Sequence, residues 1–409
     1  MLQGPVASAT IRTTFVLGLR LVLQAGTLLL VARVLGPYLF GAYVGIAALA
    51  ILLGTLTTFG TPLVLMGEAS QAFRRRLRVL PYCVSTALVC GALLIVIYLL
   101  LVNSLFGASP VSFALIVVIG LTELLVQPLM GFPSVQLQAQ RRIAASQLVH
   151  LVPLGLRFLV ILYLFLVPLG QPLTIFVIAS LLASLLGLLI ASLALPKAWP
   201  AFRHWRLPTT PELRRAAGFA MLTATARGPT EVDKSLAARL LPLATAGVYS
   251  GAARIISAVN VPVLAMVQAA LPTLFAQARQ ATGIAPKMLA TMYGAAFLYG
   301  SAAALLMWLF VPSIAWLFGD AYAGVGQAAS LLCAAIPGTT LRMTSGTVLI
   351  ARDQPWARIF YEASGVAVLL VAAIWLAPRF GVTGMIGAYV VTEWVMAFVA
   401  AGLVTRQRY

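Results

Sequence analysis

Long apolar runs separated by short polar segments make up most of the chain. A helix needs about 20 apolar residues to cross the hydrocarbon core of a bilayer. By that rule the pattern predicts twelve spanning helices, at roughly 11–32, 40–66, 79–102, 111–135, 146–167, 171–195, 213–235, 243–270, 287–311, 325–350, 357–377 and 382–404. In lipid only helices and closed barrels satisfy the backbone, and these runs are longer than the ~10-residue strands of a barrel. The pattern therefore predicts an all-α polytopic membrane protein.

An internal repeat indicates that the chain is duplicated. Residues 30–45 align without gaps to residues 236–251. The matched pairs are Leu30/Leu236, Ala32/Ala238, Arg33/Arg239, Leu35/Leu241, Gly41/Gly247, Tyr43/Tyr249 and Gly45/Gly251. The longest polar connection, 196–212, lies at the midpoint, so we expect six-helix bundles at 1–195 and 213–409 around a cytoplasmic linker. An even number of spans per repeat predicts a pseudo-two-fold axis along the membrane normal, and transporters of this design bind substrate between the halves.

Composition supports the membrane assignment and excludes other classes. The chain has 409 residues, 62% of them hydrophobic, with a mean hydropathy of +1.02, against roughly 45–50% apolar residues in soluble domains. The net charge of +18 comes from short basic clusters and not from one stripe, which argues against nucleic-acid binding. The three cysteines have no metal-ligand spacing and predict no disulfide framework. The first ten residues carry no basic region typical of a cleavable signal peptide.

The distribution of Lys and Arg predicts the orientation. With the N-terminus inside, the inner segments hold 18 basic residues and the outer segments hold 3. By the positive-inside rule both termini lie in the cytoplasm. The inner loops, including the basic run 74–78, are also expected to attract anionic lipid headgroups.

Charged residues inside the predicted spans are the candidate functional residues, because each costs ~2.5–3.5 kcal/mol at membrane depth on insertion scales. Six are basic: Arg20, Arg157, Arg227, Lys234, Arg254 and Arg342. Five are acidic: Glu123, Glu231, Asp233, Glu362 and Glu393. If most of the basic residues face inward, they predict a cationic cavity for an anionic group such as a phosphate or diphosphate. Glu362 lies one turn from Arg358 and predicts a simple ion pair.

The densest charge cluster falls in the seventh predicted span. Arg227, Glu231 and Lys234 share one helical face and can pair with each other, whereas Asp233 points elsewhere. Gly228-Pro229 is expected to break or kink the helix. Two interpretations stay open: a discontinuous helix that lines a polar cavity, or a self-neutralised ion-pair cluster near the outer interface.

The remaining acids leave a similar choice. Glu123 and Glu393 are isolated in their spans, and each either carries a proton or coupling cation or stays protonated as a packing feature. Four tyrosines near the outer ends of spans indicate an aromatic belt: Tyr38, Tyr43, Tyr249 and Tyr322. We find no catalytic constellation, cofactor motif or ATPase motif, so the sequence predicts a transporter driven by ion gradients or substrate flux, not an enzyme.

Several short motifs resemble bacterial polysaccharide flippases. Ala32-Arg-Val-Leu-Gly-Pro37, followed by Phe40-Gly-Ala-Tyr43, resembles the first outer turn of the O-antigen and exopolysaccharide lipid-carrier transporters. These belong to the multidrug/oligosaccharidyl-lipid/polysaccharide (MOP) exporter superfamily. The second-half counterparts are Asp233-Lys234, Gly247-Val-Tyr249, Ala252-Ala-Arg254, Leu317-Phe-Gly319 and Leu349-Ile-Ala-Arg352. The similarity covers essentially the whole chain, although the Gly36-Pro37 turn aligns with Pro242-Leu243 and is not repeated.

The resemblance implies a V-shaped, alternating-access transporter in the bacterial cytoplasmic membrane. Its implied substrate is a polyprenyl-diphosphate-linked oligosaccharide, moved from the inner to the outer leaflet. Its implied partners are membrane lipids, a coupling proton or sodium ion, and polysaccharide assembly proteins. The cationic cavity residues of the family carry over to Arg20, Arg227, Lys234 and Arg254. The alternative is a drug/cation antiporter of the same superfamily, while a membrane glycosyltransferase or polymerase is disfavoured by the short, acid-poor outer loops.

Overall fold

The computed structural model describes residues 5–71, 74, 76–107, 109–140, 142–195, 198–260 and 284–406, together with several residues between 262 and 278. These residues form helices and short turns, with no strand among them. They divide into two compact units, 1–35 with 46–227 and 36–45 with 228–409. The units differ from the predicted domains 1–195 and 213–409, because the boundary falls at Arg227 and not in the linker.

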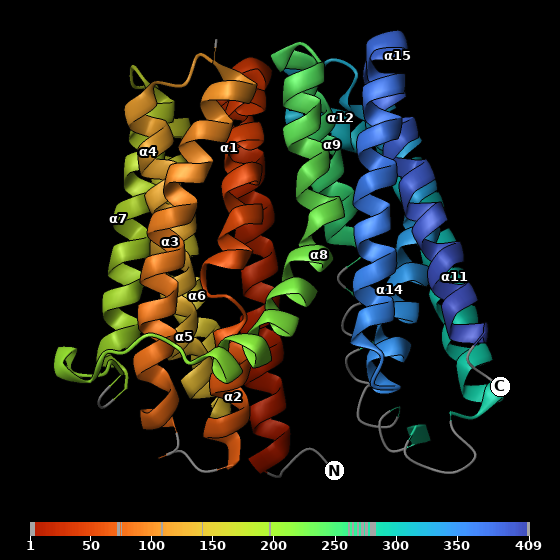
Figure 1. Ribbon diagram of the computed structural model, residues 1–409. Coiled ribbons are helices and arrows are strands. Elements are labelled where there is room, and N and C mark those ends of the chain that lie inside the picture. Colours follow the sequence, from red (N-terminus) through yellow and green to blue (C-terminus); the bar gives the residue numbers. More distant parts are fainter. Residues whose placement is uncertain are drawn as a thin grey trace. The chain divides into compact units, whose positions relative to one another are not determined.

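The first unit contains most of the N-terminal helices (Figure 1). They are α1 (Pro5–Thr57, of which 36–45 belongs to the second unit), α2 (Thr61–Gln71), α3 (Arg76–Phe106), α4 (Phe113–Leu121), α5 (Gln127–Ala139), α6 (Ile143–Leu166), α7 (Pro172–Leu193) and the first part of α8 (Thr210–Leu240). A π-helical turn, Thr122–Val126, joins α4 to α5. Such turns insert an extra residue into a helix and are frequent at functional sites.

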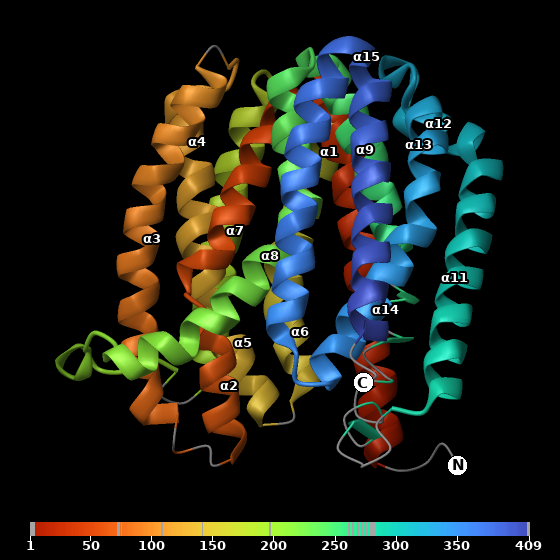
Figure 2. The same ribbon diagram turned by 45° about the vertical axis from the view of Figure 1, so that its right-hand side comes forward.

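The second unit contains the rest of α8 and the C-terminal helices. They are α9 (Leu243–Val259), α11 (Pro286–Leu309), α12 (Val311–Phe318), α13 (Val325–Leu332), α14 (Ile336–Ala351) and α15 (Pro355–Arg406). A 3-10 turn, Cys333–Ala335, joins α13 to α14. Within this unit α14 packs against both α11 and α15 (Figure 2).

Two long helices each hold two predicted spans, separated by a glycine. In α1 the backbone leaves helical geometry at Gly36 (φ 68°, ψ 167°), and in α15 it does so at Gly381 (φ 58°, ψ −135°). Positive φ is accessible to glycine because it lacks a Cβ. These kinks therefore separate the first span from the second and the eleventh from the twelfth, where the sequence predicts a boundary.

Seven helices within the described ranges are long and apolar enough to cross a membrane. They are Gly18–Thr57, Arg76–Phe106, Phe113–Ala139, Ile143–Leu166, Pro172–Leu193, Pro286–Leu309 and Pro355–Arg406. The other predicted spans correspond to α8, α9 and α13–α14; part of the predicted span 243–270 lies outside the described residues. The predicted span 40–66 is too long, because the helix ends at Thr57 and a turn with positive φ at Phe59 and Gly60 precedes α2.

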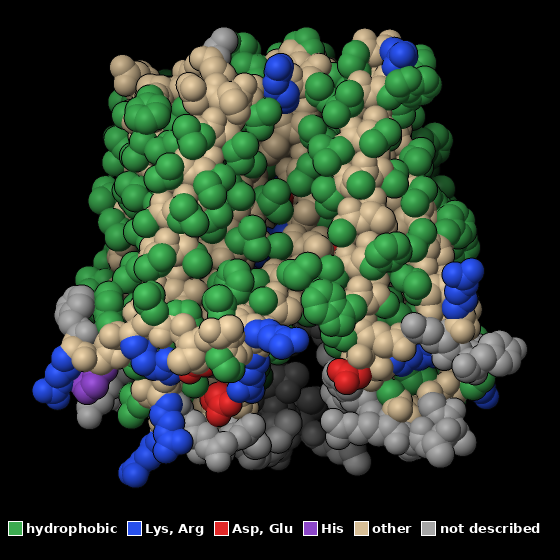
Figure 3. All heavy atoms as spheres, in the orientation of Figure 1, with side chains coloured by type: hydrophobic (Ala, Val, Ile, Leu, Met, Phe, Trp, Pro, Cys, Tyr) green, Lys and Arg blue, Asp and Glu red, His purple; other side chains and the backbone are tan. Residues whose placement is uncertain are grey.

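The described part of the linker, 198–212, packs onto the first unit instead of running free. Trp199 donates its indole N–H to Ser192 Oγ (2.7 Å) and lies edge-to-face on Phe132. Gln136 Nε2 donates to the carbonyl of Ala198 (3.2 Å). The outer surface of the same unit is largely apolar in the middle, while Lys and Arg side chains gather at its lower end in Figure 3. This distribution fits a bundle surrounded by lipid, with the basic end at the headgroups.

Candidate functional site

The first unit brings Arg20 of α1 close to Arg227 of α8. Arg20 Nη1 donates a hydrogen bond to Gln147 Oε1 on α6 (2.9 Å). The positive charge of Arg227 repels that of Arg20. Arg20 is half-buried and Arg227 is exposed. No described carboxylate lies within ion-pair distance of Arg20, so its hydrogen bond orients the guanidinium without neutralising it. Two neighbouring guanidinium groups repel each other and favour a bound anion.

Arg157 of α6 has a carboxylate partner. Its Nη2 atom lies 3.7 Å from Oε1 of Glu123 and donates a hydrogen bond to Ser184 Oγ (2.7 Å). Glu123 sits in the π-helical turn between α4 and α5. The prediction that Glu123 is isolated is therefore wrong, because packing of α6 against this turn supplies a counter-charge that is 34 residues away in sequence.

In the second unit Arg342 of α14 forms a buried bidentate pair with Glu393 of α15. The distances are 2.8 Å from Nε to Oε2 and 3.3 Å from Nη2 to Oε1. The Glu393 side chain is 0% exposed and that of Arg342 is 7% exposed. Glu393 is thus not isolated either, and Arg342 has its guanidinium committed to a protein carboxylate. The pair adds no net positive charge.

Lys234 and Asp233 form a third neutral pair, together with Tyr249 of α9. Lys234 Nζ lies 3.2 Å from Asp233 Oδ1 and also donates to the carbonyl oxygen of Thr230. The Tyr249 hydroxyl donates to Asp233 Oδ2 (2.9 Å), and all three side chains are buried. The prediction that Asp233 points away from the cluster is wrong. Adjacent residues do not share a helix face, but the flexible lysine stem lets the ammonium reach its neighbour.

Of the break or kink predicted at Gly228-Pro229, the break is absent, because α8 continues through both residues. Proline removes one backbone donor and fixes φ near the helical value. The helical assignment runs unbroken from Thr210 to Leu240, so the local disturbance does not end the helix.

Three predicted site residues keep a buried polar atom without a partner among the described residues. They are Arg157, through Nε, Glu231, through Oε2, and Arg254, through Nε. A buried polar atom without a hydrogen bond costs roughly 1–3 kcal/mol. Glu231 of α8 and Arg254 of α9 therefore retain hydrogen-bonding capacity for another group.

These ion pairs reduce the number of basic residues that can give the candidate site a net positive charge. Arg157, Lys234 and Arg342 are neutralised by Glu123, Asp233 and Glu393. The predicted bases without a described ion pair to a carboxylate are Arg20 and Arg254, and Arg227 lies beside Arg20. The predicted pair of Glu362 with Arg358 is confirmed at 2.9 Å. Across the described part of the chain no three His, Cys, Asp or Glu side chains are grouped to hold a metal ion.

Sequence reasoning missed the neutral partners of these charges. Gln147 and Ser184 are ordinary polar residues in apolar helices, and nothing in their spacing identifies them. Tyr249 was assigned to an aromatic belt but is fully buried, as is Tyr322, whereas Tyr38 is exposed as expected. Two sequence signals distinguish Tyr249: its match to Tyr43 in the internal repeat and its place in the motif Gly247-Val-Tyr249.

Comparison with known proteins gives a family and a fold. The family described as "Polysaccharide biosynthesis protein" matches residues 7–277. No curated protein matches the chain in sequence. An inward-facing multidrug resistance MATE transporter of the MOP superfamily has a TM-score of 0.73 at 16% identity, with 98% of this chain and 100% of that chain covered. The lipid II flippase MurJ, in an inward closed conformation, has a TM-score of 0.76 at 11% identity, with 97% and 87% covered.

A third similar structure has the same fold. It is a MOP superfamily transporter from Pyrococcus furiosus whose reported feature is a binding pocket of reversed polarity. Its TM-score is 0.67 at 16% identity, with 99% of this chain and 96% of that chain covered. The three structures establish that this chain has the fold of MOP superfamily transporters, and the predicted all-α polytopic architecture is confirmed.

Proposed function

Since the chain belongs to the polysaccharide biosynthesis protein family, we propose that it is a flippase for a polyprenyl-diphosphate-linked oligosaccharide. It moves this lipid from the inner to the outer leaflet of the bacterial cytoplasmic membrane, with both chain termini in the cytoplasm. The family match and the MOP fold support a transporter of this class. The two halves of the chain rock against each other to give alternating access, which is the mechanism of transporters built from repeats.

The observation that carries the substrate class is the pair Arg20 and Arg227. Among the described residues Arg20 has only the neutral partner Gln147, and the positive charge of Arg227 repels that of Arg20. Guanidinium groups bind phosphate oxygens bidentately, and such hydrogen bonds are about twice as strong as neutral ones. We assign the diphosphate to these two residues.

The acidic residues in the spans are the candidates for binding the coupling ion. Glu123, Asp233 and Glu393 already hold protein cations, so an incoming proton or sodium ion would compete with a salt bridge at each of them. Glu231 Oε2 has no partner in the described residues. We therefore place the coupling proton or sodium ion at Glu231.

The decisive experiment depletes the protein in its source bacterium and measures polyprenyl-diphosphate saccharides by mass spectrometry of the extracted lipids. Accumulation of a lipid-linked repeat unit with loss of surface polysaccharide supports the flippase and identifies the sugar. The similarity to a multidrug resistance transporter makes a drug/cation antiporter the second candidate. An unchanged lipid pool with new drug sensitivity would establish that function instead.

A further inference from the structure

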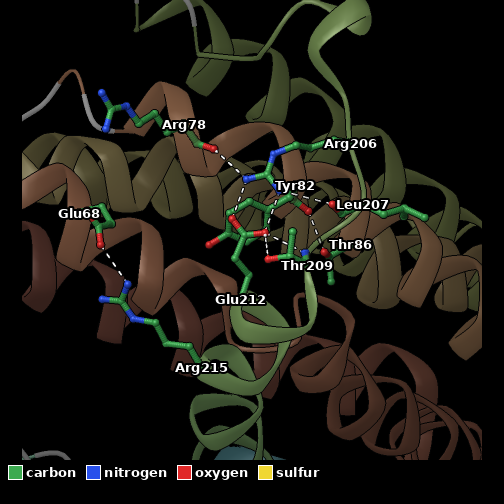
Figure 4. Close-up of polar contacts among 9 residues, drawn as sticks. All are labelled: Glu68, Arg78, Tyr82, Thr86, Arg206, Leu207, Thr209, Glu212 and Arg215. Carbon is green, nitrogen blue, oxygen red and sulfur yellow. Dashed lines mark hydrogen bonds and ion pairs between the residues drawn. The ribbon is translucent and has the colours of Figure 1, made fainter.

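One end of the first unit carries a basic surface built from α3, the linker and the start of α8. We define this basic end surface by Arg78, Arg203, Arg206, Arg214 and Arg215, all of which are exposed. Figure 4 shows Arg78, Arg206 and Arg215 around the beginning of α8. Since every member lies in the first unit, the surface does not depend on where the second unit lies.

Hydrogen bonds and ion pairs fix the linker part of this surface. Arg206 donates to both oxygens of Glu212 (2.7 and 2.6 Å), and its guanidinium lies 4.8 Å from the ring centroid of Tyr82 on α3. Glu212 also accepts from the backbone N–H of Thr209 (2.8 Å), the reciprocal half of a capping box at the start of α8. These contacts attach the linker at Arg206 to α3 and to the start of α8 (Figure 4).

Only some of the arginines have their charge neutralised by these contacts. Arg206 pairs with Glu212, and Arg215 pairs with Glu68 of α2 at 3.0 Å. Arg78, Arg203 and Arg214 have no ion pair with any described carboxylate. The surface thus presents three uncompensated positive charges.

Exposed leucines lie next to these charges. Leu77, Leu207 and Leu213 are 49%, 65% and 40% exposed, and each is adjacent in sequence to an arginine of the basic end surface. A leucine side chain that is exposed to this extent contributes little burial energy to the fold. Basic residues interleaved with apolar ones are typical of segments that lie in a membrane interface. The position at the end of the spanning helices places the surface at headgroup level (Figure 3).

We propose that the basic end surface binds anionic phospholipid headgroups of the leaflet beside it. Arg78, Arg203 and Arg214 contact the phosphates, and Leu77, Leu207 and Leu213 enter the acyl boundary. The charge is complementary to an anionic leaflet. The exposed, spread-out arrangement differs from the half-buried Arg20 to which we assign the substrate diphosphate, and the proposal does not rest on that assignment.

The test uses the full chain and native mass spectrometry, with phosphatidylglycerol and phosphatidylcholine as probes. The variant Arg78→Gln/Arg203→Gln/Arg214→Gln is compared with Arg33→Gln/Arg239→Gln/Arg379→Gln, which removes three exposed arginines elsewhere in the chain. Wild type and the second variant are expected to retain phosphatidylglycerol preferentially. The first variant loses this preference by at least about tenfold, since one base near an anionic surface contributes about fivefold. Arg78→Lys/Arg203→Lys/Arg214→Lys keeps it.

Hydrogen exchange in nanodiscs locates the effect. Adding phosphatidylglycerol is expected to slow exchange in peptides covering 198–216 in wild type and not in the first variant, while thermal unfolding confirms that both are folded. Equal lipid retention by the two glutamine variants would overturn the proposal. So would displacement of phosphatidylglycerol from wild type by an equimolar short-chain polyprenyl diphosphate, because the occupant would then be a substrate-like lipid.

Discussion

At the scale of single residues, two ion pairs in the membrane-spanning helices join residues that are distant in sequence. Arg157 with Glu123 and Arg342 with Glu393 are each predicted from sequence as separate candidates, and the structure joins them. The sequence identifies the ionisable residues because each is rare in an apolar run. It does not identify partners, since pairing depends on which helices pack together.

Glu393→Gln is expected to destabilise the protein strongly. It leaves the buried guanidinium of Arg342 without a counter-charge, and breaking a buried pair in this way costs about 3–5 kcal/mol. Thermal unfolding in detergent measures the loss. The double variant Glu393→Gln/Arg342→Met is the control, because it removes both charges and is expected to recover most of the stability. A double variant no more stable than the single one would contradict the pair's assigned role.

Arg20→Gln is expected to impair translocation while leaving the protein inserted and folded. A charged hydrogen bond contributes about 1.5–3 kcal/mol, which corresponds to a loss of roughly 10–100-fold. Transport of a fluorescent polyprenyl-diphosphate saccharide in proteoliposomes measures it. Gln147→Ala removes the hydrogen bond to Arg20 but keeps the charge, so it should cost less. If both variants transport at the wild-type rate, Arg20 does not bind the diphosphate.

At the scale of helices, backbone conformation and close approach account for features that hydropathy does not show. The matched glycines of the internal repeat, Gly41 in α1 and Gly247 in α9, meet each other in the second unit. A Cβ on Gly41 would collide with the backbone of Leu243, and one on Gly247 with that of Pro37. The repeat was visible in the sequence, but its physical basis, the contact of its two copies, was not.

Gly36→Ala tests the kink that divides α1. The position has φ 68° and ψ 167°, a region essentially restricted to glycine, and strain there costs of order 1–3 kcal/mol. No atom lies within 4 Å of a Cβ at Gly36, so the cost is that of the backbone alone. Gly18→Ala is the matched control: it is helical, equally open, and expected to be neutral or stabilising by about 0.5–1 kcal/mol. Thermal unfolding of both variants decides whether the kink needs glycine.

The start of α8 is expected to loosen in acid. Hydrogen bonds from Arg206, opposed in part by desolvation and aided by Thr209, lower the pKa of Glu212 from 4.5 to about 2. A carboxylate with a depressed folded-state pKa stabilises the fold above its unfolded pKa. That stabilisation is lost as pH falls from about 4.5 toward about 2. The surface ion pair contributes at most about 1 kcal/mol.

Hydrogen exchange of residues 205–216 at neutral pH and near pH 3 measures this acid effect. Wild type should exchange faster in acid, after correction for intrinsic rates. Glu212→Gln should exchange fast at both pH values. Equal protection of wild type at the two pH values would show that Glu212 does not hold the helix start.

At the scale of the whole molecule, the all-α architecture and the order of the spans could be predicted, because hydropathy reports burial in lipid directly. Gly36 and Gly381 lie between neighbouring spans as expected. The division of the chain could not be predicted from composition. The polar linker indicated a boundary near 196–212, but Trp199 and Arg206 attach it to the first unit, and the boundary moves to Arg227.

The direction of transport requires that the linker and both termini face the cytoplasm. The excess of basic residues on the inner side, 18 against 3, predicts this orientation.

Cys83 and Cys333 are buried and Cys90 is half-buried, so a background with all three replaced by alanine gives clean labelling. In that background Ala201→Cys in the linker and Asp320→Cys, both exposed, report opposite sides. A membrane-impermeant maleimide added to intact cells is expected to label Asp320→Cys and to reach Ala201→Cys only after lysis. The reverse labelling pattern would mean that the topology is inverted. The basic end surface would then lie at the outer leaflet, whereas the substrate starts the transport cycle in the inner leaflet.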